Sequence, residues 1–201
     1  MARATTTAPT DRPGATRRRA DAERSIAAIL DAAIEVLSER PDASMEDVAK
    51  AAGVSRQTVY AHHNSREALL AAVSERAMEQ AVAAIDAADP GRGAPDEALD
   101  RLVAASWQTV SRHARLLDSL HALYTPEELH AYHAPLFERF ERLIRRGRRA
   151  GLFDREQPAS WLLATTMNLS HTAAAEVRAG RMTEEDAGRA LTRAVHRVFS
   201  K

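Results

Sequence analysis

A run of hydrogen-bonding side chains offers the clearest chemistry in this chain: Arg56, Gln57, Thr58, Tyr60 and His62. Guanidinium, amide, hydroxyl and imidazole groups are the ones that contact phosphate oxygens and base edges in DNA. Gln57 is suited to paired hydrogen bonds with an adenine edge, and Arg56 to a guanine edge or a phosphate. The run predicts a DNA-contacting surface. The simpler interpretation is that these side chains are only exposed to solvent or, for Tyr60, packed on a neighbouring helix.

Two short helices joined by a tight turn are expected to carry this run. Ser44 is followed three residues later by an aspartate, which is the spacing of a capping box at a helix start. Gly53 is suited to end that helix, because glycine takes a positive φ without strain. Ser55 is the N-cap candidate of a second helix over residues 56–62, with Val59 facing inward. Such a pair is a helix-turn-helix.

The composition limits the function classes. The chain has 201 residues, no net formal charge at pH 7 and no cysteine. Disulfides and thiolate metal sites are therefore excluded, and any DNA contact depends on a local basic surface. No apolar run approaches the roughly 20 residues of a membrane span. No glycine-rich phosphate loop, nucleophile elbow or carboxylate pair stands out. We expect a cytoplasmic protein that is not an enzyme and needs no cofactor.

The helix-turn-helix stretch resembles the N-terminal domain of the TetR family of bacterial transcriptional regulators. The resemblance covers residues 25–70 and rests on Ala49-x3-Gly53-Val-Ser-x2-Thr58-Val-Tyr60-x-His62, followed by Ser65-Arg66-Glu67-x-Leu69. The chain departs from the family at His63, where an aromatic residue is usual, and at Arg66, where lysine is usual. We interpret His63 as a partly buried structural residue. Beyond residue 70 the resemblance is one of length and helical pattern only.

The resemblance implies roles in DNA binding for several residues. Tyr60, His62 and Arg66 match family positions that usually contact the phosphate backbone, and Ser44 with the N–H groups at its helix start is suited to the same role. Two recognition helices related by a twofold axis read half-sites about one helical turn or slightly more apart. The predicted function is a sequence-specific regulator, by family preference a repressor, that binds double-stranded DNA at a near-palindromic operator as a homodimer.

Apolar residues at three- and four-residue spacing predict an all-α fold of about nine helices. Beyond the helix-turn-helix, helices are expected over residues 22–39, 65–88, 114–124, 135–149, 158–179 and 183–199, with another starting at residue 95. A further helix is expected to start at Thr125, and Pro135 is expected to break that helix near Tyr132. The predicted domains are a basic arm over residues 1–20, a helix-turn-helix DNA-binding domain over 21–66, and a larger helical effector-binding and dimerisation domain over 67–201.

Two arginine-rich segments invite a nucleic-acid interpretation. Arg17, Arg18 and Arg19 lie in a segment rich in Pro, Gly and Thr, which is typical of a disordered tail. The same arginines are suited to lie on DNA phosphates or enter a minor groove, and both interpretations can hold. The run over residues 145–149 lies at a predicted helix C-terminus, where cations oppose the helix dipole favourably, so we interpret it as structural.

The predicted helix over residues 158–179 is apolar on two sides, so both sides must be buried. One side is expected to face its own body and the other a second subunit; burial wholly within one subunit is the alternative. In the family, the last two helices form a four-helix bundle across a twofold axis. The expected homodimer contact therefore uses the last two helices.

Bodies of TetR-like proteins usually hold a pocket for a small-molecule effector that lowers DNA affinity. Large or polar residues on the apolar helix faces are the pocket candidates here: Trp107, His121, Tyr124, Phe137, Trp161, Met167, Asn168 and His171. The plainer interpretation of each is core packing, and the alternative function is a constitutive or architectural regulator without an effector. His130 and His133 lie one turn apart, but no thiolate accompanies them and Pro135 follows, so no metal site is predicted.

Overall fold

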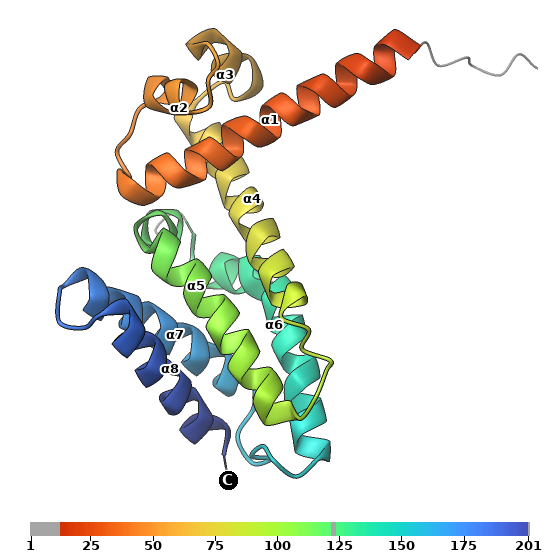
Figure 1. Ribbon diagram of the computed structural model, residues 1–201, viewed down its shortest axis with the longest axis vertical. Helices are drawn as coiled ribbons and strands as arrows, with labels where there is room; N and C mark the ends of the chain where they lie inside the picture. The colour runs from red at the N-terminus through yellow and green to blue at the C-terminus, as the bar shows by residue number, and fades with distance from the viewer. Residues whose placement is uncertain (1–12, 122–123, 201) are drawn as a thin grey trace, which may run out of the picture.

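The computed structural model describes the backbone of residues 13–121 and 124–200 and, apart from residues 13–22, 121 and 126, their side chains. Within these ranges the chain forms eight α-helices and no strand, as Figure 1 shows. The helices are α1 (Pro13–Glu39), α2 (Met45–Ala51), α3 (Arg56–His62), α4 (Arg66–Ala87), α5 (Pro95–His121), α6 (Pro126–Arg149), α7 (Ala159–Arg178) and α8 (Glu184–Phe199). The all-α prediction is confirmed.

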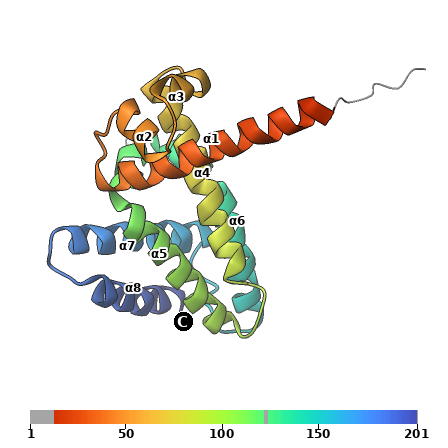
Figure 2. The same cartoon turned by 45° about the horizontal axis from the view of Figure 1, so that its top comes forward.

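The molecule has an upper layer of α1, α2 and α3 and a lower body of α5 to α8, connected by the long helix α4 (Figure 1). In the upper layer, α2 packs on α1 and α3 packs on α2, and the first turns of α1 project beyond both short helices in Figure 1 and Figure 2. In the body, α7 and α8 lie side by side and pack on α5. The helix-turn-helix is therefore held at one end of the molecule, away from the last two helices.

Two apolar cores hold these layers. The upper core joins α1, α2, α3 and α4 through residues such as Ile34, Val48, Val59 and Leu69. The body core contains buried residues of α4 to α8 together with the segment between α6 and α7. Helix α5 contributes to both, because its last turns place Leu116 and Leu120 in the upper core. Residues on both sides of the predicted domain boundary at residues 66 and 67 therefore pack in the upper core.

Helix α5 corrects the predicted division at residue 114. The segments that we expected to form two helices are one continuous helix with a kink at His113, whose φ of −112° and ψ of 19° are not helical. This merger accounts for eight helices in place of nine. The kink separates the part of α5 that packs in the body from the part that packs on α1.

Helix α6 corrects the predicted break near Tyr132. It runs from a capping box at Thr125 and Glu128 through Pro135 to Arg149 without interruption. Proline leaves the carbonyl four residues earlier without its helical partner, and that residue, Ala131, is exposed, so water can reach the group. The helix therefore tolerates the proline.

Helix α1 also differs from the prediction, since it begins at Pro13 rather than near residue 22. Proline is favoured in a first helical turn, where its missing N–H is not needed, and the following alanines and arginines are good helix formers. The part of the expected disordered arm over residues 13–20 is therefore helical. Residues 1–12 lie outside the described residues. A DNA contact by Arg17, Arg18 and Arg19 stays a prediction.

Candidate DNA-binding surface and ligand cavity

The start of α2 is fixed by a reciprocal pair of hydrogen bonds. The N–H of Asp47 donates to Oγ of Ser44 at 3.2 Å, and the N–H of Ser44 donates to Oδ2 of Asp47 at 2.8 Å. The Ser44 hydroxyl also donates to Oδ2 of Asp47 at 2.7 Å; this bond is the largest cause of the lowered pKa of the Asp47 carboxyl group, and the bond from the Ser44 N–H adds to it. The predicted capping box is therefore formed, and the hydroxyl of Ser44 is occupied by the cap.

The turn after α2 depends on one glycine. Ala52 caps the helix in the right-handed region, and Gly53 then adopts a φ of +67°. The N–H of Val54 donates to the carbonyl of Ala49 at 3.0 Å, which closes the turn. A side chain at Gly53 would meet no atom within 4 Å, so its backbone angle, rather than crowding, favours glycine.

Helix α3 buries one residue and presents most of the others outward. Ser55 caps it by accepting the N–H of Thr58 at 3.1 Å, and Val59 is fully buried in the upper core. Arg56, Gln57 and His62 are exposed, as is Tyr60 with 38% of its surface accessible, whereas Thr58 is half-buried. The polar residues that the sequence analysis identified thus lie on the outer side of α3, and the core takes up Val59.

Arg56 and Tyr60 are held together on this outer face. The guanidinium carbon of Arg56 lies 5.3 Å from the centroid of the Tyr60 ring, which is a cation–π distance. A Glu46 carboxylate oxygen on α2 lies 3.9 Å from the same guanidinium. Both groups are exposed, so the ion pair is weak, but the ring restricts where the Arg56 side chain can point.

Arg66 lies apart from these residues. Its guanidinium donates to the carbonyl of Pro41 at 2.7 Å and to the carbonyl of Ala43. The half-buried side chain therefore ties the start of α4 to the loop between α1 and α2. These bonds engage Arg66 within the domain, and the phosphate contact that we predicted for it stays a prediction.

His63 is buried, as expected for a structural residue. It ends α3, and its N–H donates to the carbonyl of Val59 at 2.8 Å. Its Nε2 atom is buried without a hydrogen-bond partner in the described part of the chain. Burial is the main cause of its lowered pKa, and His62 adds to the effect. The position thus keeps a neutral ring at the base of the recognition helix.

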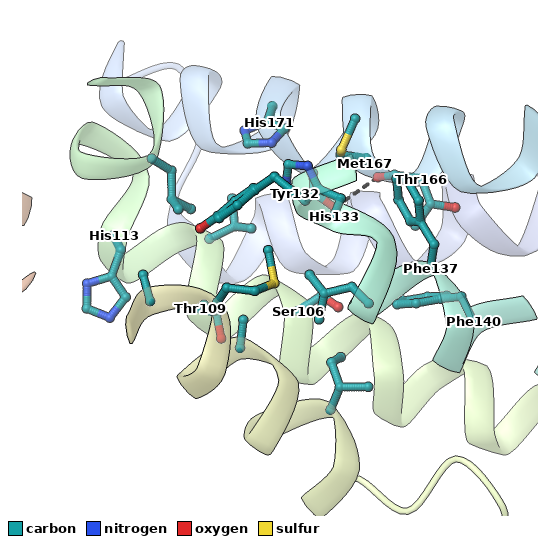
Figure 3. Close-up of a pocket in the computed structure, with 18 of the residues that line it drawn as sticks. Ser106, Thr109, His113, Tyr132, His133, Phe137, Phe140, Thr166, Met167 and His171 are labelled. Atoms are coloured by element: carbon teal, nitrogen blue, oxygen red, sulfur yellow. Dashed lines mark hydrogen bonds between the residues drawn. The ribbon is translucent and has the colours of Figure 1, made fainter. Parts of the chain in front are cut away.

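A cavity of about 110 Å³ lies in the body between α4, α5, α6 and α7. Figure 3 shows its lining side chains, with His113 at one end of the labelled group and Phe140 at the other. The lining comprises Ala77, Met78, Gln80, Ala81 and Ile85 from α4; Ser106, Thr109, Val110, His113 and Leu117 from α5; Tyr132, His133, Leu136, Phe137 and Phe140 from α6; and Leu163, Thr166, Met167, Ser170 and His171 from α7. Apolar and aromatic groups dominate this lining.

Three predicted pocket residues line the cavity: Phe137, Met167 and His171. Tyr124 lies behind the lining, with its ring centroid 5.3 Å from that of Tyr132 and its hydroxyl 2.9 Å from Oγ of Ser74. The side chain of His121 lies outside the described residues.

The other predicted pocket residues are elsewhere. Trp107 is buried in the body core, and its indole stands against Gly188 of α8. Trp161 has 59% of its surface exposed near the start of α7. Asn168 is also exposed, its amide donates to the carbonyl of Ala164 at 2.8 Å, and it does not line the cavity.

Sequence reasoning missed several polar lining residues. Ser106, Thr109 and His113 recur on one face of α5 at helical spacing, as do Thr166 and Ser170 on α7. Small polar residues that interrupt an apolar helical face were the available signal. We gave more weight to large aromatic residues, which in this chain also pack the core.

Two lining side chains also reach α1. Nε2 of Gln80 donates to Oδ1 of Asp31 at 2.9 Å, and Arg76 holds the same carboxylate at 2.8 Å. Nδ1 of His113 lies 2.8 Å from Oγ of Ser38. The cavity lining is therefore hydrogen-bonded to α1 of the upper layer.

Within the described ranges, no helix is long and apolar enough to cross a membrane. Among the same residues, no three histidine, aspartate or glutamate side chains gather in a group able to hold a metal ion. His130 is exposed, and its ring centroid lies 5.2 Å from that of Phe137.

Comparisons with known proteins agree with these features. The family model for bacterial regulatory proteins of the tetR family matches residues 29–73. The HTH-type transcriptional repressor LfrR of Mycolicibacterium smegmatis is 46% identical over 81 residues, which are 40% of this chain and 43% of LfrR. That sequence match therefore spans less than half of LfrR.

Solved structures extend the similarity over most of the chain. The crystal structure of LfrR from Mycobacterium smegmatis in complex with proflavine has a TM-score of 0.68 at 28% identity, and the match covers 89% of this chain and 98% of that one. The TetR-family regulator PfmR from Thermus thermophilus has a TM-score of 0.65 at 25% identity, with 86% of this chain and 99% of that one covered.

Proposed function

We propose, from the premise that this chain belongs to the TetR family of bacterial regulatory proteins, that it is a dimeric repressor of transcription released from its operator by a small molecule. The observation that carries the proposal is the outer face of α3. A capped, glycine-cornered pair of short helices presents Arg56, Gln57 and Tyr60 to solvent at one end of the molecule. Because a bacterial regulator that binds DNA works where the DNA lies, we place the protein in the cytoplasm.

The side chains of α3 divide into base-reading and phosphate-binding roles. Gln57 is exposed and carries both a donor and an acceptor, so it is suited to the adenine edge. Tyr60 and His62 are suited to phosphate oxygens, and the ring of Tyr60 steers Arg56 toward the same groove. Ser44 and Ser55 act through the helix starts that they cap, where N–H groups attract phosphates.

Arg66 acts on DNA through the fold. Its bonds to the carbonyls of Pro41 and Ala43 hold the loop that precedes α2. Loss of its guanidinium would therefore tilt α2 and weaken binding to all DNA sequences alike.

A homodimer through α7 and α8 is the assembly that a two-half-site operator requires. Trp161 supports this choice, because 59% of its surface is exposed in one subunit. Tryptophan is enriched at protein interfaces, where such a surface becomes buried. Leu169, Ala173 and Val177 on α7 are only partly buried within one subunit, so they are available to gain contacts. The same helices lie far from α3, which leaves the DNA-binding surface open (Figure 1).

The effector acts by population shift: it must prefer the conformation that cannot bind DNA. The cavity supports a sensor over a regulator without an effector, and LfrR supplies a relative whose structure contains proflavine. The α1 contacts of Gln80 and His113 give occupancy of the cavity a direct route to the DNA-binding domain.

The direction of the His113 bond follows from its partner. Oγ of Ser38 donates its only proton to the carbonyl of Ile34 at 2.7 Å. Nδ1 of His113 must then be the donor to Ser38, which fixes the tautomer. Burial lowers the pKa of His113, with Arg112 adding to this effect and Glu35 opposing it, so the ring is neutral at pH 7. A ligand that moves α5 at its kink breaks a directed bond to α1.

Selection from random DNA with the purified full-length protein tests this proposal. We expect a near-palindromic site with half-sites about one helical turn apart, and an affinity that falls with salt as phosphate contacts are lost. A selected site without symmetry would contradict the dimer, and no enriched site at low salt would contradict the function.

A further inference from the structure

We propose that the ligand of the cavity is an uncharged, flat aromatic molecule whose polar groups are hydrogen-bond donors. The inference rests on the proposed effector function and specifies the chemistry of its ligand. It is argued from the side chains that line the cavity and from the hydrogen bonds that their hydroxyl groups already donate.

The size and the walls of the cavity suit a flat ring system. Its volume of about 110 Å³ is many times the roughly 10–15 Å³ that one water molecule requires by a comparable measure. His133 lies 5.9 Å from Phe137 in a stacked arrangement and 5.1 Å from Tyr132 edge to face, between ring centroids. Met78 and Met167 add flexible thioethers that adapt to aromatic ligands.

Among the residues that the structure describes, no lining residue carries a formal charge. The twenty side chains include no aspartate, glutamate, lysine or arginine. Burial is the largest cause that lowers the pKa of His113, His133 and His171, so these rings are neutral at pH 7. A charged ligand would leave water without a compensating charge, and that desolvation is costly.

Three carboxylates act on lining residues from outside the cavity. Arginines hold two of them, Asp31 and Asp118, and the third, Glu35 of α1, acts electrostatically on His113 and is exposed to solvent. Asp31 accepts hydrogen bonds from Gln80 and from Arg76. Asp118, which acts electrostatically on His171, lies 2.8 Å from Arg178. Neither Asp31 nor Asp118 is therefore available to balance a ligand cation without breaking an ion pair, and the charge of Glu35 is screened by solvent.

The polar lining atoms offer lone pairs more than protons. The hydroxyls of Thr109, Thr166 and Ser170 donate to carbonyls of their own helices, at 3.3, 2.8 and 3.0 Å. Within the described part of the chain, the Ser106 hydroxyl has no hydrogen-bond partner, so it can accept or donate. Ligand N–H or O–H groups therefore find acceptors readily, whereas a ligand rich in acceptors finds few donors.

Three probes with one ring frame test the charge. Acridone is uncharged and has an N–H donor, 9-aminoacridine is a cation near pH 7, and acridine-9-carboxylate is an anion. In fluorescence titrations of the full-length protein at pH 7.5, we expect acridone to bind at least about tenfold more tightly than either charged probe. Equal or tighter binding of a charged probe, or no binding of any of the three, would overturn the proposal.

A matched pair of variants locates the effect in the cavity. Met167→Glu puts a carboxylate on the lining, and Asn168→Glu puts one on the exposed neighbouring position. We expect Met167→Glu to favour 9-aminoacridine over acridone by about tenfold relative to wild type, and Asn168→Glu to change the ratio by less than about twofold. Met167→Gln, of similar size but neutral, should keep the wild-type order. The same shift in both glutamate variants would show that the probes bind elsewhere and contradict the assignment.

The effector proposal is read out separately, by DNA affinity with and without probe. A tight cationic probe that releases DNA would overturn the charge assignment and leave the effector function standing. Tight acridone binding that leaves DNA affinity unchanged would support the charge assignment and overturn the effector function.

Discussion

The helix-turn-helix and the cavity use polar side chains in opposite ways. On α3, Arg56, Gln57 and Tyr60 point their hydrogen-bonding groups into solvent, ready for a partner of high charge. In the cavity, Thr166 and Ser170 turn their protons back to carbonyls of their own helix. One surface is prepared for polyanionic DNA, and the other for a neutral molecule.

The two regions also differ in what holds them. The geometry of α2 and α3 depends on contacts a few residues apart, such as the Ser44 and Ser55 caps and the turn at Gly53. The cavity depends on four helices that are separated by up to about a hundred residues along the chain. The difference predicts that local changes will disable DNA binding, whereas ligand binding will respond to packing between helices.

The largest effect is expected from Gly53→Val, with Gly151→Val as its matched control. Both glycines have a φ near +70°, and each follows an alanine that caps the preceding helix. At both positions a new Cβ would meet nothing within 4 Å. Each variant should lose about 1–3 kcal/mol of unfolding free energy from backbone strain. Only Gly53→Val should abolish measurable operator binding, because its strain lies in the turn that orients α3.

Fluorescence anisotropy with the selected operator, alongside thermal unfolding, measures both quantities. Equal losses of DNA affinity in the two glycine variants would contradict the separation between the regions.

A smaller and more specific effect is expected from Gln57→Ala, compared with Tyr60→Ala. Loss of a paired base contact costs about 1–3 kcal/mol of discrimination at one base pair, so Gln57→Ala should change preference among operator variants. Tyr60→Ala should weaken binding to specific and random DNA alike. Equal losses of Gln57→Ala on both kinds of DNA would refute its role in base reading.

The smallest effect is expected from Ser38→Ala, which removes the acceptor for Nδ1 of His113. A hydrogen bond of this kind contributes about 0.5–1.5 kcal/mol, so the ratio of operator affinities with and without acridone should move toward one by about two- to tenfold. Ser119→Ala is the control, since that hydroxyl donates to Arg115 within α5. An unchanged ratio in Ser38→Ala would exclude this contact as the route between the regions.

The sequence predicted the positions of α2 and α3 closely because their determinants are local. Ser44, Gly53 and Ser55 each constrain the backbone within four residues, so their spacing alone places α2 and α3. Arg66 is the exception. Its partners Pro41 and Ala43 lie more than twenty residues earlier in the chain, and nothing in the local pattern indicated them.

In the body, the sequence predicted most of the helices but not most of the residues that line the cavity. Apolar spacing located α7 and α8 to within a residue or two, whereas the continuity of α5 through His113 depends on packing against α1. Trp161 and Met167 both lie on α7 and look alike by composition, yet one is exposed and the other lines the cavity. Which face of a helix turns toward three others is a property of the assembly.

The most direct test of the account is the mass of the protein bound to its selected duplex under native conditions. We predict two subunits on one near-palindromic duplex, and loss of the complex when one half-site is scrambled. A single subunit on the duplex, or a complex that is indifferent to the scrambled half-site, would contradict the claim that paired α3 helices read the DNA.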